Sequence, residues 1–121
     1  MEVMLLGHPK SSTTRKAQRF FKERRVPFHD RDLRKRAPSP GELRRWVDAL
    51  GVEAVTDTSS KRYVDDGLAY LSADAEDWIE RLVGDPELLR LPLVRFGSVL
   101  TVGDDQEGWA AVVEAYRDEA G

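Results

Sequence analysis

The chain has 121 residues, 40% of them hydrophobic and 34% charged, and its formal net charge is −3 at pH 7. This length and composition are typical of one globular domain with a real core. The absence of cysteine excludes disulfides, thiolate metal sites and thiol catalysis by this chain, and two histidines are too few to favour a metal cluster. No apolar run reaches the roughly 20 residues of a membrane span, and the first residues lack a signal-peptide core. We therefore expect a cytoplasmic protein without a membrane segment.

Basic and acidic residues are separated along the chain. Residues 1–46 contain 13 Lys and Arg against 5 Asp and Glu, whereas residues 47–121 contain 6 against 17. The basic half predicts either a surface for a polyanion or an acidic protein, or a half that folds against the acidic one. We favour the second interpretation, because charged runs usually form solvated faces. Nucleic-acid binding is the least favoured, because the basic half lacks interleaved exposed aromatic residues.

The first part of the chain predicts a strand, a helix and a second strand. Residues 2–6 form a short apolar run followed by turn-forming residues, which is typical of a buried strand. Apolar residues recur at helical spacing within residues 12–25, with Ser11 or Ser12 as the N-cap. Residues 28–31 predict the second strand. A unit of this length implies a parallel strand pair with a right-handed crossover.

Residues 38–90 predict a block of helices. A helix follows Ser39, a short one follows residues 57–60, and another follows Ser72, because each position offers a hydroxyl or carboxylate cap before an apolar stripe. A further turn begins at residues 85–86. The tryptophans lie on apolar stripes and are predicted to pack in the core or at its edge rather than to stack on nucleic-acid bases.

The last part predicts two strands, over residues 91–96 and 99–102, joined by a two-residue turn at Gly97-Ser98. A final helix covers residues 106–116. The order β-α-β, helices, β-β-α predicts an α/β protein with a thioredoxin-like fold and a helical insertion at about residues 38–90. We expect a single domain over the whole chain, with the hairpin antiparallel to the first strand.

The loop after the first predicted strand reads GHPKSSTTRKA. It resembles the pattern G-x-P-x-C-x-T/S-x-x-K-A of the arsenate reductase/Spx-like group of thioredoxin-fold proteins, the ArsC-like family. Five positions of this chain match that pattern: Gly7, Pro9, Thr13, Lys16 and Ala17. Residues 28–32, 55–63 and 85–94 resemble three further segments of the family, in the same order. The resemblance covers essentially the whole chain and implies the family's fold.

The resemblance also indicates what this chain lacks. The family's cysteine falls on Ser11, and the second cysteine of some members falls on Thr14. The family's arginine before the loop proline falls on Leu91, with Arg90 one position earlier. A serine hydroxyl is essentially un-ionised at neutral pH, and arsenate reduction needs sulfur chemistry. The resemblance therefore implies the fold of an oxidoreductase without its thiol activity, that is, a pseudoenzyme.

We expect the remaining function to be the non-catalytic, regulatory binding of a protein partner or a small oxyanion, without a metal or cofactor. The candidate binding residues share a place at the start of the first helix or beside the loop proline: Lys10, Ser11, Ser12, Thr13, Thr14, Arg15, Arg90 and Pro92. Pro92 resembles the cis-proline that faces the reactive loop in thioredoxin-like folds. Spx-like relatives bind RNA polymerase, so the resemblance makes RNA polymerase a candidate partner.

Two alternatives keep an enzymatic role. In the first, Ser11 is a nucleophile and His8 its base, but no third orienting group is evident, and a plain helix cap is the favoured interpretation. In the second, the protein is a glutathione-dependent reductase or transferase whose co-substrate supplies the thiol. Binding of glutathione, measured by calorimetry, distinguishes that alternative from a binding module.

Overall fold

A computed structural model describes residues 1–121. The chain forms two compact units. The first, here called the sheet unit, comprises Met1–Leu33 and Leu91–Gly121, and the second, the helical unit, comprises Arg34–Arg90. No helix is both long and apolar enough to cross a membrane.

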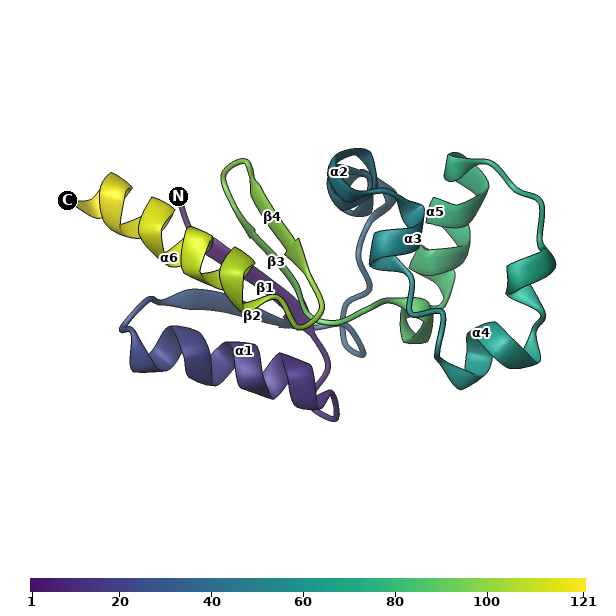
Figure 1. The fold of residues 1–121 in the computed structure, drawn as a ribbon, viewed down its shortest axis with the longest axis horizontal. Helices are drawn as coiled ribbons and strands as arrows, with labels where there is room; N and C mark the ends of the chain where they lie inside the picture. The colour runs from purple at the N-terminus through teal and green to yellow at the C-terminus, as the bar shows by residue number, and fades with distance from the viewer. The chain divides into compact units, whose positions relative to one another are not determined.

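The sheet unit contains four strands and two helices (Figure 1). Its elements follow in chain order: β1 (Val3–Gly7), α1 (Ser12–Glu23), β2 (Phe28–Asp32), β3 (Leu93–Phe96), β4 (Val99–Val102) and α6 (Gln106–Ala120). The strand order is β2-β1-β3-β4, with β1 parallel to β2 and antiparallel to β3, and β3 antiparallel to β4. The predicted thioredoxin-like order is therefore confirmed, including the antiparallel hairpin.

The core of the sheet unit lies between its strands and its two helices. Alternate residues of β1 and β3 point to this core because side chains of a strand alternate between its faces. Phe21 of α1 and Trp109 of α6 are fully buried in it, and the half-buried Phe20 lies beside them with its ring centroid 5.5 Å from that of Trp109. The buried members of this core are Val3, Leu5, Ala17, Phe21, Val26, Val94, Phe96, Trp109, Val112 and Val113. One face of α1 is thus buried in the core of the sheet unit.

The helical unit has four α-helices and two short 3₁₀ helices (Figure 1). They are α2 (Pro40–Leu50), α3 (Val52–Val55), α4 (Lys61–Asp65), η1 (Leu68–Tyr70), α5 (Ala75–Gly84) and η2 (Pro86–Leu88). Its only strand-like pairing is an isolated bridge between Thr56 and Leu89. This unit is the predicted helical insertion, and it has its own buried residues: Leu43, Trp46, Val47, Val55, Leu68, Ile79, Leu82, Leu88 and Leu89.

One local prediction in the helical unit is wrong. The cap of α5 is Asp74 rather than Ser72: the Asp74 carboxylate accepts the backbone N–H of Asp77 at 2.9 Å. Both residues are good caps, and only the position of the helical turn decides between them.

Candidate functional site

The loop between β1 and α1 is organised by the cap of the helix. The Ser11 hydroxyl accepts the backbone N–H of Thr14 at 3.1 Å, which satisfies one of the orphan donors of the first turn. Ser11, rather than Ser12, is therefore the N-cap, and Ser12 is exposed at the first helical position. The residue at the family's cysteine position thus has a structural role in this chain.

Thr14 is the buried centre of the loop. Its side chain is 1% exposed, and its hydroxyl accepts the backbone N–H of His8 at 3.4 Å. A Cβ atom added at Gly7 would collide with the Thr14 side chain. Glycine is thus required at the end of β1 for close approach to Thr14.

Thr13 joins the loop to the segment that carries the loop proline. Its hydroxyl donates to the backbone carbonyl of Leu91 at 2.7 Å, although the two residues are 78 positions apart. The Leu91–Pro92 peptide bond is cis, as predicted, and Pro92 is buried. The Pro92 carbonyl in turn accepts the backbone N–H of Gly103 at 3.0 Å. The loop and the proline segment are therefore held together by direct hydrogen bonds.

The two basic side chains of the loop, Lys10 and Arg15, are exposed. Arg15 Nη1 donates to the backbone carbonyl of Pro9 at 2.7 Å, so its side chain lies back along the loop. Lys10 contributes its backbone N–H to His8 Nδ1 at 3.0 Å. These cations lie beside the start of α1, where a negative charge is favoured.

No serine–histidine pair is formed. His8 Nδ1 is an acceptor for the amide of Lys10, and the side-chain neighbour of Ser11 Oγ is Thr13 Oγ1, at 3.1 Å. A general base must reach the proton that it removes, within about 2.6–3.2 Å or through one water. The arrangement therefore gives Ser11 a cap and a hydroxyl neighbour, and the predicted alternative of a Ser11 nucleophile with His8 as base has no supporting contact.

Arg90, the remaining candidate, belongs to the helical unit, whereas the other seven belong to the sheet unit. Its backbone N–H donates to the Val55 carbonyl at 2.8 Å, and its Nη2 donates to the Thr56 carbonyl at 3.3 Å. Both bonds reinforce the bridge between Thr56 and Leu89. The contacts of Arg90 are thus those of a residue that ties two segments of its own unit together.

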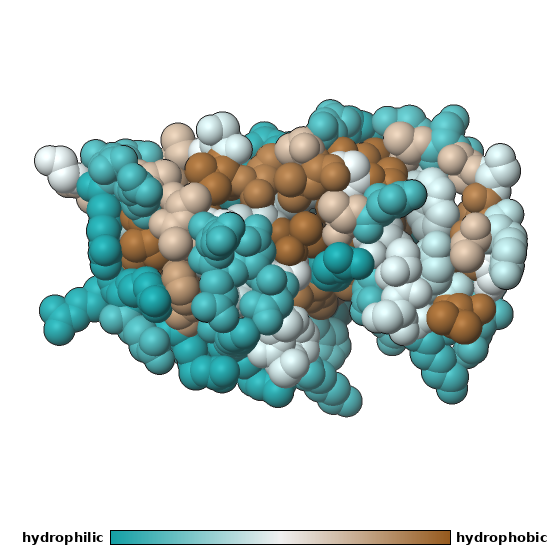
Figure 2. All heavy atoms as spheres, in the orientation of Figure 1, coloured by the Kyte–Doolittle hydropathy of each residue, from teal (hydrophilic) through white to brown (hydrophobic).

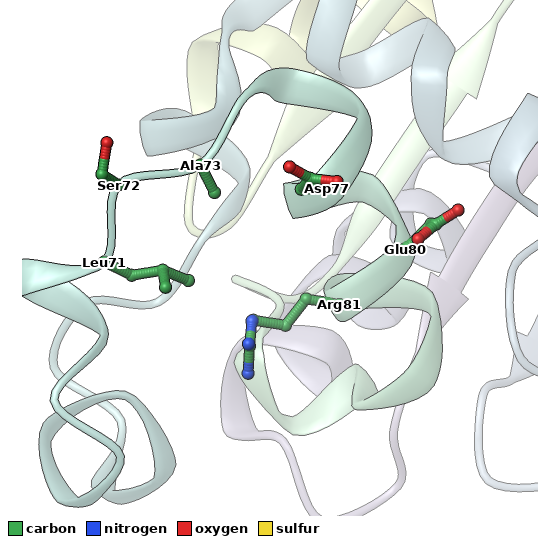
Figure 3. Close-up of a pocket in the computed structure, with 6 residues that line it drawn as sticks. All are labelled: Leu71, Ser72, Ala73, Asp77, Glu80 and Arg81. Atoms are coloured by element: carbon green, nitrogen blue, oxygen red, sulfur yellow. The ribbon is translucent and has the colours of Figure 1, made fainter.

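The helical unit also has a surface hollow of about 510 Å³ (Figure 3). Leu71, Ser72 and Ala73 line it from the segment before α5, and Arg81 reaches into it from α5, where Asp77 and Glu80 also lie. The hollow mixes charges of both signs and contains none of the candidate residues of the loop. In the whole chain, no group of three or more His, Asp or Glu side chains is placed to hold a metal ion.

Sequence reasoning placed the loop between the first strand and the first helix but did not predict how its residues are connected. The spacing of hydroxyl residues indicated a cap, and Ser11 supplies it. The bond from Thr13 to the Leu91 carbonyl had no signal in the sequence, because it joins two segments that only the fold brings together.

Comparisons with known proteins agree with the resemblance to the ArsC family. A sequence profile of the ArsC family matches residues 6–112. The chain is 28% identical over 120 residues to the uncharacterized protein YusI of Bacillus subtilis. This match covers 91% of this chain and 100% of YusI. It is 22% identical over 104 residues to the regulatory protein MgsR of the same organism. This second match covers 84% of this chain and 82% of MgsR.

Among solved structures, the crystal structure of an ArsC-family-related protein from Bacteroides fragilis is similar to this chain. The TM-score is 0.84 at 26% sequence identity, and the match covers 93% of this chain and 98% of the other. The thioredoxin-like fold with its helical insertion is thus shared by a solved structure along nearly its whole length.

Proposed function

Because this chain belongs to the ArsC family, we propose that it is a member without thiol chemistry that acts by binding a protein partner or a small oxyanion. The observation that carries the proposal is the state of Ser11. This residue stands where the family pattern has its cysteine, and its hydroxyl is already engaged as the cap of α1. The chain has no cysteine elsewhere that could take over the reaction.

The chemistry of oxygen explains why the substitution removes the family's reaction. A thiolate is the nucleophile and the electron donor in thiol redox reactions, and thiol pKa values fall well below 8.5 at helix N-termini. The Ser11 hydroxyl has no comparable ionisation and forms no bond equivalent to a disulfide. No base contacts it, because His8 is hydrogen-bonded to the amide of Lys10.

The binding surface that we propose lies around the Ser11 loop and Pro92. The hydrogen bond from Thr13 to the Leu91 carbonyl fixes the loop against the proline segment, which supports a preformed surface rather than one that orders on binding. The exposed side chains of Lys10 and Arg15 give this surface a positive charge. A small oxyanion or an acidic group of a partner is therefore the ligand chemistry that suits it best.

The similarity to the regulatory protein MgsR supports a regulatory role. RNA polymerase, the partner of Spx-like proteins, is accordingly one candidate partner of this chain. Purified RNA polymerase from the native host should be retained by the immobilised wild-type protein at moderate salt. If an immobilised Lys10→Glu/Arg15→Glu variant retains the polymerase equally well, the loop surface takes no part in that interaction.

The loss of thiol chemistry is tested with one variant that restores the thiol. We expect no arsenate reductase activity from the wild-type protein with glutathione and glutaredoxin or with thioredoxin. In Ser11→Cys, the pH dependence of alkylation should report a thiol pKa below the ordinary value of about 8.5, because the sulfur takes the cap position of α1. Ser98→Cys, in the exposed hairpin turn, is the matched control and should titrate near 8.5.

Two results would overturn the proposal. The first is wild-type turnover of arsenate above the blank. The second is saturable binding of glutathione to the wild-type protein in a calorimeter, which would favour the alternative of a glutathione-dependent enzyme that uses the thiol of its co-substrate.

A further inference from the structure

The outer face of α1 carries three cations in a row. Arg15, Arg19 and Lys22 are separated by four and three residues, a spacing that places side chains next to one another on one face of a helix. All three are exposed, and the buried face of α1, with Ala17 and Phe21, points elsewhere. Hydrophilic residues cover the part of the surface where α1 lies (Figure 2). We call Arg15, Arg19 and Lys22 the basic stripe.

The basic stripe has no acidic partner, whereas Lys16 and Arg24, two other cations of this helix and its end, are engaged. Lys16 Nζ lies 2.9 Å from Asp104 Oδ2. Arg24 stacks on the Phe20 ring, with Cζ 3.5 Å from the ring centroid, and donates to the Phe20 carbonyl. The only side-chain hydrogen bond of the stripe is the one from Arg15 to the Pro9 carbonyl, which leaves the charge of Arg15 uncompensated.

We propose that the basic stripe is a docking surface for an acidic segment of a partner protein, with carboxylates at matching helical spacing. This inference rests on the proposed function, since it names the chemistry of the partner. The stripe extends about 10 Å along the helix, at about 1.5 Å per residue. Three carboxylates at positions i, i+4 and i+7 of an acidic helix span the same length.

The surroundings of the stripe favour a narrow acidic segment over a nucleic acid. On one side, Gln18 donates to Asp30 of β2 at 3.1 Å, which brings a carboxylate beside the stripe. Two carboxylates lie on the other side of the stripe: that of Glu23 in α1 and that of Asp104, which pairs with Lys16. An extended phosphate backbone, which needs about 600–1,000 Å² of protein surface even for a single module, would meet these negative charges. A single acidic helix aligned with α1 would lie between them.

The probe is a fluorescent helical peptide with glutamates at positions i, i+4 and i+7, and its control is the same peptide with glutamines there. Wild-type protein should bind the glutamate peptide, and raising the salt from about 50 to 200 mM should weaken binding. The double variant Arg19→Glu/Lys22→Glu, which leaves the bond from Arg15 to the loop intact, should weaken binding about tenfold or more.

The matched control variant is Arg45→Glu/Lys61→Glu, which changes the net charge equally at two exposed positions of the helical unit. It should bind the peptide as the wild type does, within about twofold. If the control loses as much affinity as the stripe variant, only net charge matters and the inference is wrong. Equal binding of the glutamine peptide would also refute it.

Two further outcomes would give the stripe another occupant and overturn the proposal. One is tighter binding of a DNA duplex than of the peptide, lost in Arg19→Glu/Lys22→Glu. The other is self-association of the wild type in sedimentation experiments that the same variant abolishes. None of these results depends on Ser11, so the thiol experiments on Ser11→Cys decide the proposed function separately.

Discussion

The helical unit and helix α1 of the sheet unit use their charged residues differently. In the helical unit, arginines tie segments together: Arg44 forms two hydrogen bonds to the Glu76 carboxylate, and Arg62 lies 2.9 Å from Asp85. In the sheet unit, α1 holds its place through an apolar face and a hydroxyl cap, and its outer face keeps three unpaired cations. Arginines thus hold segments of the helical unit together, whereas the three cations on the outer face of α1 have no acidic partner.

Hydrogen bonds within the loop explain why it can persist without its nucleophile. Ser11, Thr13 and Thr14 each make a hydrogen bond that holds the loop or joins it to the proline segment. These bonds depend on oxygen atoms and not on a thiolate. The scaffold of the site is therefore stable without the family's chemistry, and the adjacent surface of α1 is available for another purpose.

The largest effect is expected from the apolar face of α1. Phe21→Ala should lower the free energy of unfolding by about 3–5 kcal/mol, because the ring is fully buried in the core of the sheet unit. Urea denaturation followed by tryptophan fluorescence measures it. Tyr70→Ala, at a side chain that is 93% exposed in the helical unit, is the control and should change stability by less than about 0.5 kcal/mol. A loss below about 1 kcal/mol for Phe21→Ala would show that α1 is not held by this core.

The fold was predictable because its signals are local and consistent. The apolar run of β1, the turn at Gly97-Ser98 and the capping residues place the main elements within a few residues of their observed bounds. Short elements such as α3 were missed, because four residues carry too little periodicity to distinguish a helix from a loop.

The site was only partly predictable. Its hydroxyl residues and its cis-proline were identified from their place in the sequence pattern. Which cations are free was not predictable, because pairing depends on tertiary neighbours. Lys16, next to Arg15 in sequence, is paired with Asp104, whereas Arg19 and Lys22 are not paired. Charge counts along the chain cannot separate these cases.

An intermediate effect is expected from the cap of α1. Ser11→Ala should cost about 0.5–2 kcal/mol, because the N–H of Thr14 loses its acceptor. Ser12→Ala is the control and should be nearly neutral, since Ser12 is exposed and is not the cap. Thermal or urea unfolding of both variants gives the comparison. Equal losses for the two variants would contradict the assignment of Ser11 as the structural residue of the loop.

The smallest effect is expected from the ion pair of the helical unit, and it depends on pH. The hydrogen bonds and the charge of Arg44 hold the pKa of the Glu76 carboxyl below its ordinary value. A carboxyl with a lowered pKa in the folded state contributes stability above its unfolded pKa, of about 4.3, and loses that contribution as the pH falls through the folded value. Since the pair is exposed to solvent, the contribution is small and is screened by salt.

Comparison of Glu76→Gln with the wild type isolates this contribution. The difference in unfolding free energy between them should be greatest near pH 7 in low salt and should shrink as the pH falls below 4. Urea denaturation at pH 7 and pH 3 measures the difference. Because the pair lies on α2 and α5 of the helical unit, whereas the stripe residues belong to α1 of the sheet unit, Glu76→Gln should leave binding of the glutamate peptide unchanged. A difference that grows toward acid pH would reverse the sign derived for Glu76, and a loss of peptide binding would show that the peptide is not held by the basic stripe of α1 alone.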